Sequence, residues 1–555
     1  MRAPCREFGI VRQHEISLAQ TDMSIDRRLF LQRTLWTWAG LSAGLADPAK
    51  AAVPSKGGSL IVAQFPEPPA LTSALTTAGP AQSISAKLFD GLLRYGPNLE
   101  PLPGLATQWQ VSADNLSLTF KLRAGVRWHD GEPFTSADVA FSLLEVWKRY
   151  HGRGRSTFAN VVAVDRPDSL TAVLRLSKPA PYILSALMSV ESQVIPKHRY
   201  AGTDILNNPL NNAPIGTGPF RFKSWTRGSH IVLERNPDYW DAGKPHLDEI
   251  VFQIMPEPDG VAAALETGSV HLAPGNNVPQ SAIAQLSREP SLTVITRGAD
   301  FSVGLDVFEF NLDRPLFRDP RVRQAIAHMI DRDFIVKNIL FGYGVAAQAP
   351  IPPQMTTFFT DQVPHYPHDP QRAEALLDAA GFPRGANGTR LSFTHDLLPS
   401  GGFPQTAQFI RASLARIGVK MDIRPTDYGE FVNRVYTQRD FDTTLYGATA
   451  GPDPAIGTQR FYWSNNFQPG VAFSNGAHYR NPEVDRLLEA AQTETDTAKR
   501  RALYDRFQAI VQTDLPRIPI VSGNSVLLTN RRVRNVVTAV DGFYGNYADA
   551  TIASA

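Results

Sequence analysis

The sequence has very little cysteine: Cys5 is the single thiol among 555 residues. One thiol can form neither an internal disulfide bond nor a multi-cysteine metal site. Because Cys5 lies at the very start of the chain, removal of an N-terminal leader would leave no thiol at all. Packing, hydrogen bonds and ion pairs must therefore stabilise the rest of the protein.

An excess of charge of one sign is also missing. The chain carries 55 Lys and Arg residues against 53 Asp and Glu residues, and residues 53–555 alone carry 48 of each. A chain without net charge has no global electrostatic attraction to nucleic acid or to an anionic membrane. We therefore expect no nucleic-acid partner.

Long hydrophobic runs are absent as well. The apolar stretch at residues 35–46 is shorter than the roughly 20 residues that a transmembrane helix needs. It follows residues 27–32, RRLFLQ, which resemble the twin-arginine export motif, and it precedes small residues at 49–52. A positive region, a short apolar region and an A-x-A site are typical of a cleaved signal peptide.

This pattern predicts export to the periplasm by the twin-arginine translocase. We expect the leader, residues 1–52, to be cleaved near Ala51 or Ala52. Residues 1–22 have no signal character and precede Met23, so Met23 is an alternative start of the natural protein.

The signatures of common enzymes are missing too. No Walker A, dinucleotide-binding or H-E-x-x-H pattern occurs. The pattern G-x-S-x-G appears at residues 40–44, but within the leader, where the strand-to-helix turn that a catalytic serine needs is not expected. Residues 216–219, GTGP, are rich in glycine, but Pro219 lacks the N–H that a phosphate cradle would use. We predict that the protein is not an enzyme and needs no cofactor.

His365, His368 and Asp369 are the residues that most resemble metal ligands. Pro364 and Pro367 favour an extended backbone there, and Asp369 precedes a proline as a helix N-cap would. A structural role explains all three residues, so we predict no metal site.

The residues that are present indicate a large α/β protein. Hydrophobic residues make up 43% of the chain, and about 500 residues usually form two or more domains. Asp319-Pro320, Asp369-Pro370 and Asn481-Pro482 each place a capping side chain before a proline, which predicts three helix starts. Alternating apolar stretches at 303–311 and 419–423 predict strands between such helices.

The most informative segment is residues 120–142, FKLRAGVRWHDGEPFTSADVAFS. It predicts a strand with Phe120, Leu122, Val126 and Trp128, then a turn at Asp130-Gly131 and a helix that starts at Thr135. Thr135 and Asp138 have the spacing of a capping box, in which each side chain bonds to a backbone N–H near the helix start.

This segment closely resembles the signature of bacterial extracellular solute-binding proteins of family 5, the dipeptide, oligopeptide and nickel receptors of ABC importers. Other blocks that resemble the family follow in the expected order between about residues 58 and 536. They are FDGL at 89–92, LPGLA at 102–106 with Trp109, GTGPF at 216–220 and ERNPDYW at 234–240.

The resemblance implies a type II periplasmic-binding-protein fold in its large form, with two lobes that enclose the ligand. We expect the first lobe to comprise residues 53–306 and 519–555, with an inserted subdomain at about 97–212. The second lobe would comprise residues 307–518.

The resemblance also implies ligand contacts. In the family, the loop within residues 441–463 faces the cleft, so its aromatic and polar side chains are candidates. Further candidates lie in the loop after the first strand, in the first crossing segment and near residue 395. The predicted ligand-binding residues are Phe65, Glu67, Phe310, Asn311, His395, Tyr446, Thr449, Asp453 and Trp463.

Two anchors of peptide-binding members are missing. Those members place an aspartate a few residues before the Asp-Pro pair to hold the peptide's amino terminus, but residues 449–452 contain no carboxylate. They also place a basic residue for the peptide's carboxylate near residues 397–402, where this chain has none. Asp453 could serve instead as a displaced anchor for an amine, or His395 and Asp396 could supply the polar contacts.

We therefore expect a monomeric receptor that captures a peptide or a peptide-like solute and delivers it to the transmembrane subunits of an ABC permease. A receptor for nickel, a metal chelate or another small organic solute is the alternative, with His395 as the candidate histidine. A periplasmic hydrolase is a third possibility, and it would need a nucleophile with a nearby base.

Overall fold

The computed structural model describes residues 56–97, 99–296, 301, 303–398, 400–523 and 526–553. The chain divides into Met1–Val53 and Pro54–Ala555. Cys5, the twin-arginine pattern, the G-x-S-x-G sequence and the expected cleavage site therefore lie outside the described residues.

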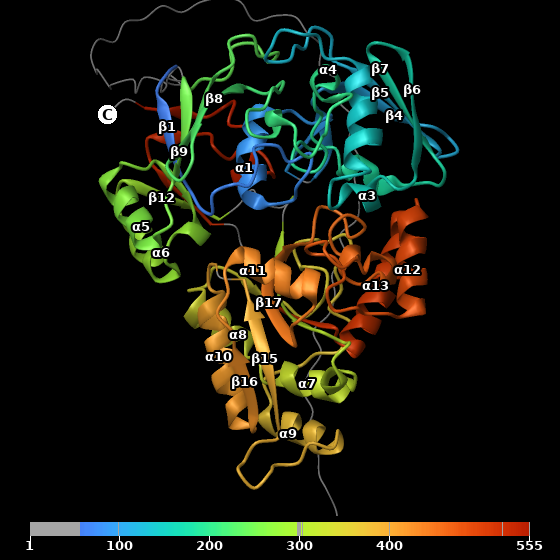
Figure 1. The fold of residues 1–555 in the computed structure, drawn as a ribbon, viewed down its shortest axis with the longest axis vertical. Helices are drawn as coiled ribbons and strands as arrows, with labels where there is room; N and C mark the ends of the chain where they lie inside the picture. The colour runs from blue at the N-terminus through green and yellow to red at the C-terminus, as the bar shows by residue number, and fades with distance from the viewer. Residues whose placement is uncertain are drawn as a thin grey trace, which may run out of the picture. The chain divides into compact units, whose positions relative to one another are not determined.

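A seven-stranded sheet forms the framework of the first lobe. Its central strand, β1, pairs in parallel with β10 and β11, while β8, β9 and β19 add antiparallel neighbours. Figure 1 shows α5 and α6 beside this sheet. In order across the sheet the strands are β12 (Leu292–Ile295), β19 (Leu527–Asn530), β11 (Leu272–Pro274), β1 (Ser59–Gln64), β10 (Glu249–Ile254), β9 (His230–Arg235) and β8 (Phe220–Thr226).

A six-stranded sheet forms the framework of the second lobe. Strand β13 lies between β18 and β17 and pairs antiparallel with both, whereas β15 pairs in parallel with β16 and β17. The order is β14 (Val345–Ala346), β18 (Arg517–Gly523), β13 (Gly304–Phe310), β17 (Thr443–Thr449), β15 (Leu391–Leu397) and β16 (Val419–Ile423). The sheet contains both parallel and antiparallel strand pairs, and helices lie between its strands along the chain. This arrangement confirms the expected α/β class.

A separate four-stranded sheet contains the first residues of the signature segment, 120–122. Its order is β4 (Ala106–Val111), β5 (Ser117–Leu122), β7 (Thr171–Leu176) and β6 (Val161–Asp168). Helix α2 (Ser136–Phe141) begins after Thr135, and the reciprocal bonds of a capping box between Thr135 and Asp138 are both present. The strand and the helix predicted for residues 120–142 are thus confirmed, although β5 ends at Leu122 and Trp128 lies buried outside any strand.

The three predicted helix starts are confirmed. Asp319, Asp369 and Asn481 each accept a hydrogen bond from a backbone N–H in the first turn. The longer helices are α1 (Gly79–Leu88), α5 (Pro258–Thr267), α6 (Gln280–Leu286), α7 (Pro320–His328), α9 (Pro370–Ala379), α10 (Phe403–Arg416), α12 (Pro482–Thr493) and α13 (Thr497–Asp514). Shorter helices are α3 (Gly154–Thr157), α4 (Lys197–Tyr200), α8 (Arg332–Phe334) and α11 (Tyr428–Val432).

Sheet membership bears on where the lobes join. Strands β13 and β18 lie entirely in the six-stranded sheet. The boundaries expected from the sequence place residues 304–306 and 519–523, which belong to these strands, in the first lobe. We propose that the chain crosses between β12 and β13 and again between β18 and β19. The four-stranded sheet at residues 106–176 is our proposed inserted subdomain.

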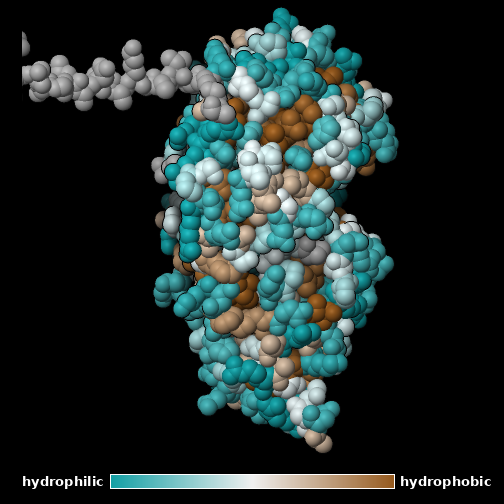
Figure 2. All heavy atoms as spheres, turned by 90° about the vertical axis from the view of Figure 1, so that its left-hand side faces the viewer, coloured by the Kyte–Doolittle hydropathy of each residue, from teal (hydrophilic) through white to brown (hydrophobic). Residues whose placement is uncertain are grey.

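None of the helices in the described part of the chain has the length and hydrophobicity that a membrane span requires. On the face drawn in Figure 2, hydrophobic side chains form separate patches among hydrophilic ones.

Candidate functional site

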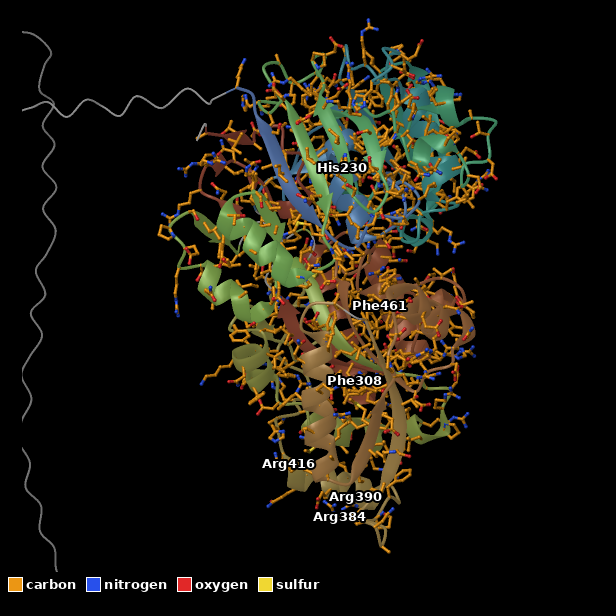
Figure 3. The ribbon with its side chains drawn as sticks, turned by 60° about the vertical axis from the view of Figure 1, so that its left-hand side comes forward. His230, Phe308, Arg384, Arg390, Arg416 and Phe461 are labelled. Carbon is orange, nitrogen blue, oxygen red and sulfur yellow. The ribbon has the colours of Figure 1, made fainter. Side chains whose placement is uncertain are left out.

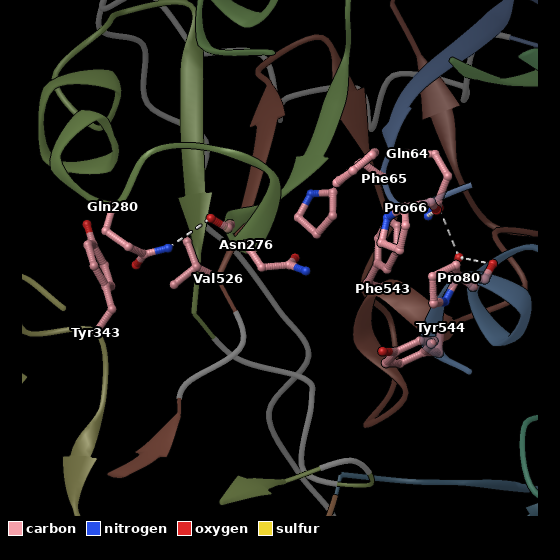
Figure 4. A pocket seen from close by; sticks show the side chains of 14 residues that line it. Gln64, Phe65, Pro66, Pro80, Asn276, Gln280, Tyr343, Val526, Phe543 and Tyr544 are labelled. Carbon is pink, nitrogen blue, oxygen red and sulfur yellow. Dashed lines mark hydrogen bonds between the residues drawn. The ribbon is translucent and has the colours of Figure 1, made fainter. Parts of the chain in front are cut away.

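A cavity of about 360 Å³ opens at the carboxyl end of β1. Its walls come from the end of β1, the start of α1, the turn before α6 and the C-terminal segment, and Tyr343 joins them from the second lobe. Figure 4 shows the cluster of Phe65, Phe543 and Tyr544 facing Gln280 and Tyr343. The size is within the range of small-molecule sites in proteins, roughly 300–1,000 Å³.

Hydrogen bonds from side chains fix the wall at the end of β1. The side chain of Asn277, with its amide oriented to suit its neighbours, donates to the carbonyl of Phe65 and accepts from its N–H, each at 3.0 Å. Gln64 is buried and accepts a bond from the hydroxyl of Ser83 on α1 at 3.1 Å. These bonds hold Phe65, which lines the cavity and is 41% exposed.

None of the described residues that line this cavity carries a charge. Four aromatic rings and the side chains of Gln64, Ser83, Asn276 and Gln280 supply an apolar surface with amide and hydroxyl groups. Such a lining suits the planar, hydrogen-bonding backbone of a peptide or a similar uncharged portion of a solute. A charged end of the solute must find its partner elsewhere.

A second cavity, of about 470 Å³, shares Asn276 and Gln280 with the first. Residues of α5 and α6 line one side of it. Its other side belongs to the second lobe and includes Phe341 and Gly401. The two cavities therefore lie along the junction of the two lobes, where a closing receptor would hold its ligand.

The two candidates in the loop after β1 have different surroundings. Phe65 lines the first cavity. The carboxylate of Glu67 instead accepts hydrogen bonds from Trp225 at 2.8 Å and from the N–H of Gly228 at 3.1 Å. Glu67 thus fastens the turn between β8 and β9.

Phe310, Asn311 and Tyr446 lie in the interior of the second lobe. Phe310 and Tyr446 are fully buried, and the Tyr446 hydroxyl donates to Glu309 at 2.7 Å. Asn311 donates to the carbonyl of Phe441 at 2.9 Å. Burial leaves these side chains no surface for a ligand, so we retain none of them as a proposed contact.

His395 is also fully buried. Its ring stacks on Phe308, with centroids 4.9 Å apart, and its Nδ1 is 2.8 Å from the hydroxyl of Thr443. Figure 3 labels Phe308 within the second lobe. Burial lowers the pKa of His395 to about 3, so the ring is neutral at physiological pH and belongs to the core.

The substitution His395→Phe is expected to remove part of the acid sensitivity. In the wild-type protein, His395 protonates near pH 6.5 when unfolded but only near 3 when folded, so stability falls by about 1.4 kcal/mol per pH unit below 6.5. The variant keeps the stack on Phe308 and should gain about 2 kcal/mol relative to wild type between pH 7 and pH 5. Urea unfolding at both pH values checks this.

Equal pH slopes for His395→Phe and wild type would contradict the buried, neutral state of His395. Weaker solute binding in His395→Phe would return it to the ligand site.

The candidates of the loop after β17 are mostly engaged within the protein. Asp453 is buried and makes a two-pronged ion pair with Arg500, at 2.5 and 2.7 Å. The indole of Trp463 donates to Glu489 at 3.0 Å. Thr449 is half-buried at the end of β17 and remains a proposed contact.

One acid of the second lobe stands out in the structure and was not among the sequence candidates. Asp306 is half-buried on β13. Burial raises its pKa to about 7, and it has no hydrogen-bonding or ionic partner within the described ranges. Strand alternation alone would make it an ordinary polar residue, so only its surroundings reveal it.

The other cavity residues also escaped the sequence reasoning. Asn276, Gln280, Tyr343 and Phe543 come from segments that lie far apart in the chain, and no local motif connects them. In the part of the chain that the structure describes, no three His, Cys, Asp or Glu side chains are placed to hold a metal ion.

Comparison with known proteins identifies the family. The model of "Bacterial extracellular solute-binding proteins, family 5 Middle" matches residues 100–469. The chain therefore belongs to this family of solute-binding proteins, which serve ABC transporters.

Individual relatives cover nearly the whole chain. A protein of Brucella ovis named for ABC transporter peptide binding is 31% identical over 511 residues, which are 87% of this chain and 92% of the relative. The solved binding protein DppA of Helicobacter pylori, in complex with the peptide STSA, is 27% identical with a TM-score of 0.79, and the match covers 90% of this chain and 98% of that one. The solved protein AgaA of A. tumefaciens R10, in complex with agropinic acid, is 26% identical with a TM-score of 0.77 and coverage of 90% and 99%.

Proposed function

We propose that this protein is the receptor of an ABC importer for peptides or peptide-like solutes, and that it binds them between its two lobes. The observation that carries the proposal is the uncharged, aromatic cavity at the junction of the lobes, with walls from both. The names of the relatives support peptides as the solute class, while the agropinic acid complex shows that the same fold also holds a different organic solute.

Several features of the receptor are part of this proposal. The leader, with its twin-arginine pattern and cleavage near Ala51 or Ala52, would direct a monomeric protein to the periplasm. There it would present the closed form to the permease subunits. Binding energy would drive lobe closure, and no covalent step would occur.

A thermal-shift screen tests the proposed function. Residues 53–555 are incubated with tripeptides, amino acids, sugars and nickel–histidine, and the unfolding temperature is recorded. Because a ligand that binds only the native state stabilises it by mass action, a bound tripeptide at 100 times its Kd should add about 2.7 kcal/mol.

Tripeptides are expected to give the largest shifts. Shifts with sugars or nickel–histidine and none with peptides would replace the peptide assignment with one of those solutes. A variant with an aromatic side chain removed from the cavity, Phe65→Ala, should reduce the shift, while Phe334→Ala, at an exposed site outside the described cavities, should not.

A further inference from the structure

Three acids of the second lobe show how this protein normally treats a buried carboxylate. Each is paired with arginine at hydrogen-bond distance, because an unpaired buried charge is costly. The pairs are Glu309 with Arg517, Asp396 with Arg424 and Arg434, and Asp453 with Arg500. Asp306 differs from these three acids, because it is half-buried and within the described ranges no cation or hydrogen-bond donor meets its carboxylate.

The space beside Asp306 is shaped by a glycine and an aromatic ring. Gly447 lies directly opposite Asp306 in the β13–β17 pair. A methyl group on Gly447 would lie 2.8 Å from Oδ1 of Asp306 and 3.3 Å from Cζ of Phe403. The carboxylate and the half-buried ring therefore converge above Gly447, and an acid beside an aromatic ring is a combination that binds ammonium groups.

This place adjoins the cavities already described. Phe403 begins α10, two residues after Gly401, which lines the second cavity. Gly402 in between packs closely against Leu340, whose carbonyl accepts the N–H of Tyr343, a wall of the first cavity. Asp306 thus lies beside the second-lobe segments that face the solute cavities.

We propose that Asp306 holds a positively charged group of the bound solute, such as the terminal ammonium of a peptide. The assignment rests on the proposed function and extends it by naming the charge of the solute and the residue that recognises it. It also supplies the charged partner that the first cavity lacks.

The unpaired carboxylate makes binding depend on pH. The side chains next to it on the neighbouring elements, Phe403 on α10 and Val521 on β18, do not titrate, and Gly447 on β17 has none. Burial raises the pKa of Asp306 to about 7. A cation binds the ionised form, so below pH 7 each binding event must release a proton and affinity falls about tenfold per pH unit.

Titration calorimetry of wild type and two variants tests the proposal. The probes are the tripeptide that gives the largest shift among an Ala-Xaa-Ala set, its N-acetylated form, and the non-peptide amines putrescine and glucosamine. Asp306→Asn removes the charge at nearly constant volume, and Asp333→Asn does the same at an exposed site of the same lobe. Asp306→Asn should weaken binding by about 10- to 100-fold, as expected for a hydrogen bond to a charged group.

The supporting result is strong binding of the free amine, weak binding of the acetylated form, and a pH slope between 5 and 7 that Asp306→Asn abolishes and Asp333→Asn retains. Equal affinity of Asp306→Asn and wild type, or of free and acetylated peptide, overturns the role of Asp306 while the peptide receptor stands. If putrescine or glucosamine binds and the peptides do not, and Asp306→Asn loses this binding, the peptide assignment is overturned and the role of Asp306 is supported. If none of the amines binds, both the peptide assignment and the role of Asp306 are overturned.

Unfolding of the two variants without ligand gives an independent check. An unpaired, half-buried carboxylate with a raised pKa destabilises the free protein above pH 7, so Asp306→Asn should unfold at higher urea concentration than wild type at pH 8. A lower midpoint would show that Asp306 has a structural partner, and it would overturn the assignment.

Discussion

Arg500→Met is expected to destabilise the protein by about 3–5 kcal/mol, the loss typical when one partner of a buried ion pair is removed. Arg500 and Asp453 are both almost completely buried, and two hydrogen bonds join them. Arg500 also donates to the carbonyl of Ala491 at 2.7 Å. The variant would leave the Asp453 carboxylate in the core without its cation.

Two controls isolate the buried charge. Arg486→Met removes an exposed arginine of α12 that pairs with Glu483 on the same helix, and it should cost less than about 1 kcal/mol. Asp453→Asn combined with Arg500→Met should recover part of the loss, because no unpaired charge then remains. Urea unfolding measures all three.

Equal stabilities of Arg500→Met and Arg486→Met would contradict the structural role of the Asp453–Arg500 pair. Loss of solute binding in Asp453→Asn, with stability unchanged, would restore Asp453 as the displaced amine anchor that the sequence suggested.

Gly216→Ala should be the second severe change, with a loss of about 3 kcal/mol from overpacking. A methyl group on Gly216 would lie 1.7 Å from the carbonyl oxygen of Leu88, the last residue of α1. The turn at residues 216–218 cannot move away from α1, because His129 holds it at two points. The Nδ1 atom of His129 accepts the N–H of Gly216 at 3.0 Å, and the Nε2 atom of His129 is 3.1 Å from the carbonyl oxygen of Gly218. Helix α1 starts at the first cavity, so its displacement should also weaken solute binding.

Gly260→Ala is the matched control for Gly216→Ala. Gly260 lies within α5, where the nearest atom to an added methyl group is 3.8 Å away, and alanine is the better helix former by about 1 kcal/mol. It should raise the urea midpoint. A Gly216→Ala variant as stable as wild type would contradict the close contact between this turn and α1.

The helix starts were predictable because their determinants are local. Asp319, Asp369 and Asn481 each cap a helix that begins at the following proline. The strand predicted at 419–423 and the capping box at Thr135 depend on neighbouring residues in the same way. A family resemblance then supplied what local rules cannot, namely the assembly of these elements into two lobes.

The ligand site was less predictable because it depends on distant contacts. Asp453 has the sequence of a ligand loop, but Arg500, which neutralises it, lies on a helix 47 residues further along the chain. His395 was attractive for its chemistry, yet its stack on Phe308 encloses it in the core. Asp306 stands out because, within the described ranges, no arginine pairs with it. The sequence of one strand cannot show which side chains from distant segments surround a residue.

The central claim is that the protein binds a solute reversibly and does not transform it. Its most direct test is calorimetric titration of residues 53–555 with the tripeptide that gives the largest thermal shift, followed by release of the ligand and mass spectrometry. We predict binding of one tripeptide per protein molecule and recovery of the peptide with its mass unchanged. Cleavage or modification of the peptide during incubation, or no saturable binding, would contradict the account.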